Sequence, residues 1–187
     1  MSDVRAKIIE AFLAFSDLGD PTIQILLYRH GHRDQPWGSE GDNGLSGRGL
    51  AQRAEWQRNI REMIASPAFT GTSWTPRLFS SPKIRCRETL EAWTESFREA
   101  RIEIDPRLDE QSGVPDQIFF AQVREFLKSV STGSLGNRIV ACSHGDWIPV
   151  FVEVATGQKV NLGTAGCVLI KFGGRDSAEL LAVVAGI

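Results

Sequence analysis

The three histidines of this sequence are its best candidates for chemistry, because imidazole changes charge near neutral pH. His30 follows an apolar run at 23–28, and His144 follows a second apolar run at 138–143. Each is followed by glycine, and His32 lies two residues from the first. We therefore predict that His30 and His144 form a functional pair, rather than caps that only hydrogen-bond neighbouring carbonyls.

Two kinds of chemistry suit such a pair. One is metal ligation, for which the N and O ligands would be His30, His32, Asp34, His144 and Asp146. The other is nucleophilic attack by a histidine on a phosphoryl group. Arg29 precedes His30, and Arg85 follows the Ser-Ser-Pro segment 80–82. Guanidinium groups repel divalent cations but bind phosphate oxygens, so the pattern favours an anion site with no metal and no other cofactor.

The segments that must position these residues alternate between strand and helix patterns. Short apolar runs predict strands at 23–28, 77–80, 102–104, 138–143, 168–172 and 180–185, and helical spacing of apolar residues covers 46–64, 86–97, 119–130 and 147–156. This alternation predicts an α/β fold, a three-layer sandwich whose mostly parallel central sheet has helices on both faces. In such sheets the site lies beyond the carboxyl ends of the strands.

Composition and charge limit the other possibilities. The 187 residues predict a single domain over 1–187, with residues 1–20 forming an extra N-terminal amphipathic helix. A net charge of −2 does not favour nucleic acid, and no segment is apolar enough to span a membrane. The three cysteines are scattered and odd in number, which indicates reduced thiols and a cytoplasmic protein. The sequence does not indicate an oligomeric state.

Five segments resemble, in order, the motifs of the histidine phosphatase superfamily, which includes the phosphoglycerate mutases. They are Arg29-His30-Gly31, Leu45 to Gln52 (the family's LTxxGxxQ), Ser80 to Thr89 (SSPxxRxxQT), Leu108-Asp109-Glu110 (LxE) and Ser143-His144-Gly145. The similarity extends from about Ile25 to the final strands and leaves out the N-terminal helix.

The resemblance implies that His30 attacks phosphorus, forms a phosphohistidine and is then freed by water. It also implies that the phosphoryl oxygens are held by Arg29, Arg85 and His144. Glu110 is the implied general acid and then base, with Asp109 and Asp116 as competing carboxylates. Many members carry a glutamate or glutamine where this sequence has His32, which we expect to contact the substrate.

The segment after the acid, 111–117, is shorter than in phosphoglycerate mutases. Because a mutase must exclude water from its intermediate, an open site favours hydrolysis over transfer. In size the chain resembles the short bacterial phosphohistidine phosphatases, so the expected partner is a phosphorylated small molecule or a phosphoprotein. Three alternatives remain open: a phosphotransferase or mutase with the same intermediate, a non-catalytic phosphate-binding module, and a metal-dependent hydrolase.

Overall fold

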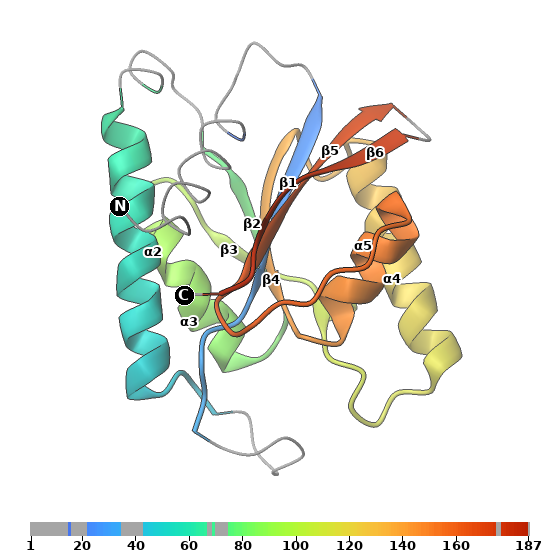
Figure 1. Ribbon diagram of the computed structural model, residues 1–187, viewed down its shortest axis with the longest axis horizontal. Helices are drawn as coiled ribbons and strands as arrows, with labels where there is room; N and C mark the ends of the chain where they lie inside the picture. The colour runs from blue at the N-terminus through green and yellow to red at the C-terminus, as the bar shows by residue number, and fades with distance from the viewer. Residues whose placement is uncertain are drawn as a thin grey trace.

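A central sheet of six strands, in the order β3-β2-β4-β1-β5-β6, organises the computed structural model (Figure 1). The structure describes residues 15, 22–34, 43–66, 69, 75–174 and 177–186. The strands are β1 (Ile23–Arg29), β2 (Arg77–Ser80), β3 (Ile102–Ile104), β4 (Arg138–Ser143), β5 (Cys167–Gly174) and β6 (Ser177–Val184). The helices are α2 (Gly47–Ala65), α3 (Ile84–Thr94), α4 (Asp116–Ser131) and α5 (Trp147–Thr156), with a short 3-10 helix, η1 (Pro106–Leu108).

Strands β3, β2, β4 and β1 run parallel, and β5 and β6 form an antiparallel hairpin beside β1. The two central strands, β4 and β1, are short apolar runs because helices cover both of their faces. All six residues of β4 are buried. The predicted strands are confirmed, although β5 begins one residue earlier than expected and both hairpin strands are longer.

Helices α2 and α3 cover one face of the sheet, and α4 and α5 cover the other (Figure 1). Each face has its own buried apolar cluster, with Trp56 and Trp93 on the first side and Phe126 and Trp147 on the second. The predicted three-layer α/β sandwich is therefore confirmed. No described helix is long and apolar enough to cross a membrane.

The N-terminal helix expected over residues 1–20 lies outside the described residues, except for Phe15. The ring of Phe15 is buried and meets Trp93 of α3 edge-on, with 6.1 Å between the ring centroids. Helix α3 ends at Thr94, before Phe97, which was expected on its apolar face. Phe97 nevertheless stacks on Trp93 at 5.7 Å, so its predicted burial is confirmed.

Candidate active site

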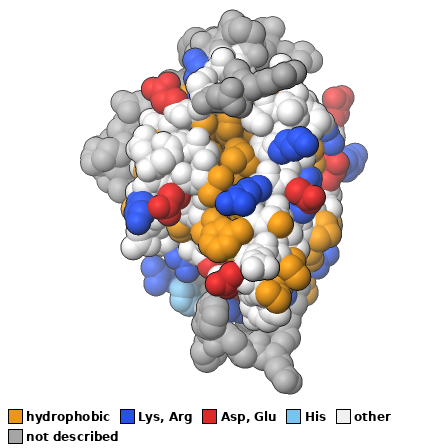
Figure 2. Space-filling view, turned by 90° about the vertical axis from the view of Figure 1, so that its right-hand side faces the viewer, with side chains coloured by type: hydrophobic (Ala, Val, Ile, Leu, Met, Phe, Trp, Pro, Cys, Tyr) orange, Lys and Arg blue, Asp and Glu red, His pale blue; other side chains and the backbone are white. Residues whose placement is uncertain are grey.

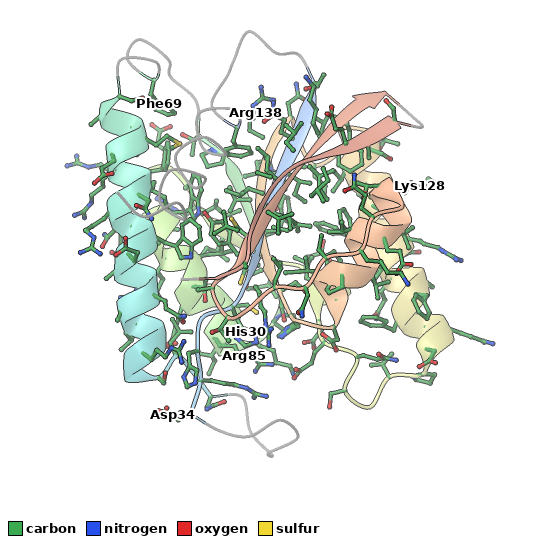
Figure 3. All side chains as sticks on the ribbon, viewed as in Figure 1. His30, Asp34, Phe69, Arg85, Lys128 and Arg138 are labelled. Atoms are coloured by element: carbon green, nitrogen blue, oxygen red, sulfur yellow. The ribbon has the colours of Figure 1, made fainter. Side chains whose placement is uncertain are left out.

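The pairing of β1 with β4 brings the two His-Gly segments together. These strands are parallel neighbours, and Arg29 pairs with Ser143, so His30 and His144 leave the sheet side by side. The backbone N–H of His30 donates to the carbonyl of Ser143 at 3.1 Å. The two imidazole rings have centroids 5.3 Å apart. Figure 3 shows His30 next to Arg85 below the ends of the strands.

His30 is held in the form that a nucleophile requires. Its Nδ1 lies 2.8 Å from the carbonyl oxygen of Gly31, which can only accept, so Nδ1 carries the proton. Burial lowers the pKa of His30 to about 3, and the charges of Arg85 and Arg29 act in the same direction. The ring is therefore neutral at physiological pH, and its Nε2 carries a lone pair that no group in the described part of the chain engages.

His144 is also neutral, but both of its ring nitrogens contact protein groups. Its Nδ1 lies 3.3 Å from Nη2 of Arg85, and its Nε2 lies 2.8 Å from the hydroxyl of Ser81. Arginine can only donate, so Nδ1 accepts and the single proton resides on Nε2. Burial lowers the pKa of His144 well below its usual range, and His30 and Arg85 lower it further.

Two arginines lie near the histidines, and each contacts different groups. Arg29 ends β1 and donates to the carbonyl of Leu162, while burial lowers its pKa against the opposing effect of Asp146. Arg29 packs so closely on Gly145 that a Cβ at that glycine would lie 2.7 Å from the guanidinium carbon. Arg85, in the first turn of α3, is 1% exposed, and its Nη2 lies 2.8 Å from Oε2 of Glu110.

The three carboxylates considered as proton donors occupy different positions. Glu110 reaches toward the histidines, with its side chain 15% exposed and Oε2 3.8 Å from Nδ1 of His144. Asp109 instead accepts from the Ser81 hydroxyl at 3.2 Å and from the backbone N–H of Glu110 at 2.9 Å. Asp116 begins α4, is exposed, and accepts from the Gln111 side chain at 2.6 Å.

These residues surround a cleft of about 310 Å³ at the carboxyl ends of the strands. Its lining comprises Arg29, His30, His32, Arg33, Glu110, His144, Gly145, Asp146 and Thr164. Five of the six predicted site residues therefore lie in one cleft, and the sixth, Arg85, contacts two of them.

Of the metal ligands considered earlier, Asp34 is exposed and does not line the cleft. Among the described residues, no cluster of three or more His, Cys, Asp or Glu side chains could hold a metal ion.

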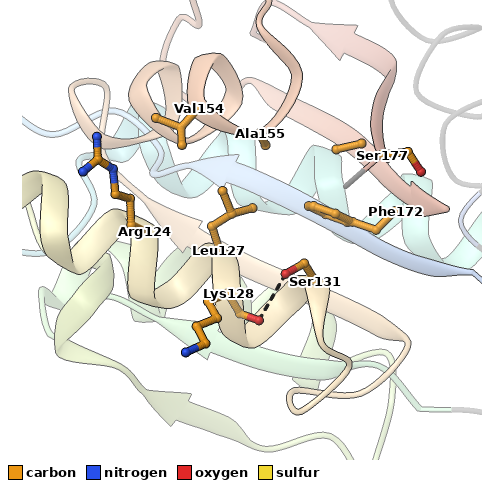
Figure 4. A pocket seen from close by; sticks show the side chains of 9 residues that line it. Arg124, Leu127, Lys128, Ser131, Val154, Ala155, Phe172 and Ser177 are labelled. Carbon is orange, nitrogen blue, oxygen red and sulfur yellow. Dashed lines mark hydrogen bonds between the residues drawn. The ribbon is translucent and has the colours of Figure 1, made fainter. Parts of the chain in front are cut away.

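Another hollow lies on a different face of the molecule, between α4, α5 and the β5–β6 hairpin (Figures 2 and 4). It measures about 340 Å³ and is lined by Arg124, Leu127, Lys128, Ser131, Val154, Ala155, Phe172, Ser177 and Ala178. This lining contains no histidine, cysteine or carboxylate. Of the two hollows, the cleft at the strand ends is therefore the candidate active site.

Two polar residues support the cleft without having been assigned a role from the sequence. Thr89 of α3 accepts from the backbone N–H of Gly31 at 3.0 Å and donates to the carbonyl of Arg85 at 2.7 Å. Gln52 of α2 accepts from the backbone N–H of His32 at 2.8 Å. Both belong to the segments that resemble family motifs, and each is a buried polar side chain in a helix. Because Thr89 and Gln52 are far from the histidine segment in the sequence, no local sequence pattern predicts these hydrogen bonds.

The chain is similar to known proteins in sequence and in fold. The family model of the histidine phosphatase superfamily (branch 1) matches residues 25–116, which confirms the resemblance inferred from the motifs. No curated protein sequence matches the chain.

Similar solved structures include a proposed alpha-ribazole-5'-phosphate phosphatase from Escherichia coli, with a TM-score of 0.68 and 16% identity over 88% of this chain and 98% of that one. The protein histidine phosphatase SixA complexed with tungstate has a TM-score of 0.66 and 14% identity, covering 87% of this chain and 97% of its own. A phosphoglycerate mutase from Bacillus anthracis has a TM-score of 0.64 and 13% identity, covering 87% and 93%. At these identities the similarity establishes a shared fold.

Proposed function

We propose that the chain, which is similar to the histidine phosphatase superfamily over residues 25–116, hydrolyses a phosphomonoester or a phosphoprotein through a phosphohistidine at His30. The observation that carries the proposal is the state of His30: its proton is fixed on Nδ1, its ring is neutral, and among the described residues no group hydrogen-bonds to Nε2, which lies in a cleft lined by arginines. A neutral imidazole beside guanidinium groups is suited to attack phosphorus, since the cations attract the phosphoryl oxygens and disfavour imidazolium.

In the first step the Nε2 lone pair of His30 bonds to phosphorus, and the bond from phosphorus to the leaving oxygen breaks. Arg29, Arg85 and His144 would hold the three phosphoryl oxygens, where negative charge is spread in the transition state. Arg85 already bridges His144 and Glu110, so a bound phosphoryl group would exchange part of this contact for its own. His32, which lines the cleft, would contact the substrate.

Glu110 is the proposed acid and base. It would give its proton to the leaving oxygen in the first step, and its carboxylate would take a proton from water in the second. That water then attacks phosphorus, the bond to Nε2 breaks, and inorganic phosphate leaves. Glu110 lines the cleft, whereas Asp109 is bonded to Ser81 and Asp116 is exposed on α4.

The proposed chemistry needs no metal ion, because arginine and histidine side chains supply the positive and hydrogen-bonding groups. The proposed compartment is the cytoplasm, since Cys86, Cys142 and Cys167 are all free thiols and all buried.

The test is a phosphoester panel that includes p-nitrophenyl phosphate and a phosphohistidine protein, run with EDTA for wild type and His30→Ala. We expect chelator-resistant turnover by wild type only, and phosphate on His30 by mass spectrometry after a quench that avoids acid. Activity that EDTA abolishes and zinc or manganese restores would favour a metal hydrolase. Labelled phosphate that reaches an added alcohol faster than water indicates a transferase. Phosphate binding without a burst of leaving group from any substrate indicates a non-catalytic module.

A further inference from the structure

The hydroxyl of Ser81 occupies a position that the proposed reaction leaves unexplained. It lies at the start of the segment after β2, fully buried, 2.8 Å from Nε2 of His144 and 3.2 Å from Oδ1 of Asp109. It also accepts from the backbone N–H of Lys83 at 3.3 Å. The cleft does not include Ser81 in its lining, so Ser81 acts on the site through other residues.

The direction of each hydrogen bond follows from what a hydroxyl can do. A serine hydroxyl has one proton and two acceptor sites. Lys83 N–H takes one acceptor site, and the Asp109 carboxylate can only accept, so it takes the proton. The remaining acceptor site receives the Nε2 proton of His144. This assignment agrees with the one reached independently from Arg85, which requires a lone pair on Nδ1.

We infer that Ser81 and Asp109 are positioning residues for His144, forming a relay in which Asp109 orients the Ser81 hydroxyl and the hydroxyl holds the imidazole proton on Nε2. The Nδ1 edge of the ring is thereby turned toward Arg85 and Glu110, the side from which the phosphoryl group would be bound. The inference rests on the proposed function, because that function supplies the anion that His144 meets.

Asp109 is well fixed for this task. Its Oδ1 accepts from the backbone N–H of the next residue at 2.9 Å and lies 3.6 Å from Nε2 of His144. Its Oδ2 is 3.8 Å from Nζ of Lys83. The carboxylate is therefore a negative charge held at the end of the ring that points away from Arg85.

The relay predicts how His144 responds to a phosphate dianion. A dianion beside Nδ1 favours a second proton there, taken from solvent, and that proton can then be donated to a phosphoryl oxygen. The Asp109 carboxylate would stabilise the resulting imidazolium through Ser81. The titratable or charged groups that face His144 from the surrounding segments are His30, Arg33, Lys83, Arg85, Cys86, Asp109 and Glu110. Burial and the cations oppose imidazolium at His144, whereas His30 is neutral in this pH range, so the two carboxylates and the bound dianion must offset the burial and the cations.

The test measures the dissociation constant of inorganic phosphate by calorimetry from about pH 6 to about pH 9 in wild type, Asp109→Asn, Ser81→Ala and Ser81→Thr. The ratio of variant to wild type at each pH cancels the titration of phosphate itself. At about pH 6 we expect Asp109→Asn and Ser81→Ala to bind about tenfold more weakly, which corresponds to one pKa unit in His144. By about pH 9 we expect Ser81→Ala to bind like wild type, and Asp109→Asn to bind at least as tightly as wild type, because only the loss of its charge then acts. Ser81→Thr keeps the hydroxyl and should bind like wild type. Asp116→Asn, which removes an exposed carboxylate on α4, is the matched control and should also leave binding unchanged.

The sign of the effect separates the relay from simple electrostatics. Removal of the Asp109 charge by itself should tighten the binding of an anion, so equal or tighter binding in Asp109→Asn at about pH 6 overturns the relay. Weakening by the same factor at every pH indicates a merely structural role and also overturns it. A wild-type protein that binds phosphate with the expected variant pattern but hydrolyses no phosphoester contradicts the proposed function and leaves the relay supported.

Discussion

The rings of His30 and His144 lie 5.3 Å apart at an angle of 61°, yet their hydrogen bonds differ. Within the described part of the chain, His30 contacts a hydrogen-bonding partner only through Nδ1, whereas both nitrogens of His144 are engaged. The difference supports the distinct roles proposed for two residues with the same strand-end context. His30 has the free lone pair of a nucleophile, and His144 has the fixed orientation of a ligand-binding group.

The buried neutral state of His30 predicts a loss of stability in acid. In the unfolded chain this histidine binds a proton below pH 6.5, but in the folded protein it does so only near pH 3. Between those values the unfolded state holds more protons, so the free energy of unfolding falls as pH falls, by up to about 1.4 kcal/mol per pH unit for one histidine. His30→Gln should therefore lose less stability than wild type between pH 7.5 and 5.5. Urea unfolding at the two pH values measures this, and an equal loss in both proteins contradicts the assigned state.

Gly145→Ala tests the close approach of Arg29 to the turn after β4. The new Cβ would lie 2.7 Å from the guanidinium carbon and 2.9 Å from Nε, so the guanidinium must move. We expect kcat/KM to fall by about 10- to 100-fold, because a displaced catalytic group loses orientation. Gly47→Ala in the first turn of α2 is the control, since nothing lies within 4 Å of its Cβ position. A Gly145→Ala enzyme as active as the control would show that Arg29 is not required in this position.

Thr89→Val tests the support of the His30 segment by α3. Valine keeps the shape of threonine but removes the acceptor for the Gly31 N–H, and an unsatisfied buried donor costs about 1–3 kcal/mol. We expect a lower free energy of unfolding and reduced kcat, with Thr89→Ser close to wild type in both. Denaturant unfolding and steady-state kinetics measure the two effects. The support role is excluded if the serine and valine variants behave alike.

Glu110→Gln tests the proton donor. With an alkyl phosphate, whose leaving oxygen needs a proton, we expect kcat to fall by about 10²- to 10⁴-fold. With p-nitrophenyl phosphate the first step needs no acid, so the variant should release a burst of nitrophenol equal to the enzyme and then turn over slowly. Stopped-flow absorbance measures the burst. Normal turnover of the alkyl ester by this variant would assign the proton transfer to another group.

Several features of the fold could be predicted because their causes are local. The apolar run before His30 and the one before His144 each make a buried strand, and the polar residues after them must leave the sheet. The parallel direction of these strands follows from the helices between them, whereas their position as neighbours in the sheet depends on the tertiary structure. The position of Pro149 in the first turn of α5 likewise needs no tertiary information, because a proline there loses no helical hydrogen bond. The N-terminal helix stays a prediction, since all but one of its residues lie outside those described.

The six side chains of the proposed site, and the end of the sheet at which they lie, could be predicted from the sequence. Three features required the tertiary structure. The first two are the ring nitrogen that carries the proton in each histidine, and the burial of Arg85 against Glu110. The third is the hydrogen bond of Asp109 with Ser81, which places Asp109 outside the cleft lining. Local patterns specify which residues leave a strand end. Proton positions and the choice between adjacent carboxylates depend on contacts of about 3 Å between segments far apart in the chain, and only the pairing of β2, β4 and β1 creates those contacts.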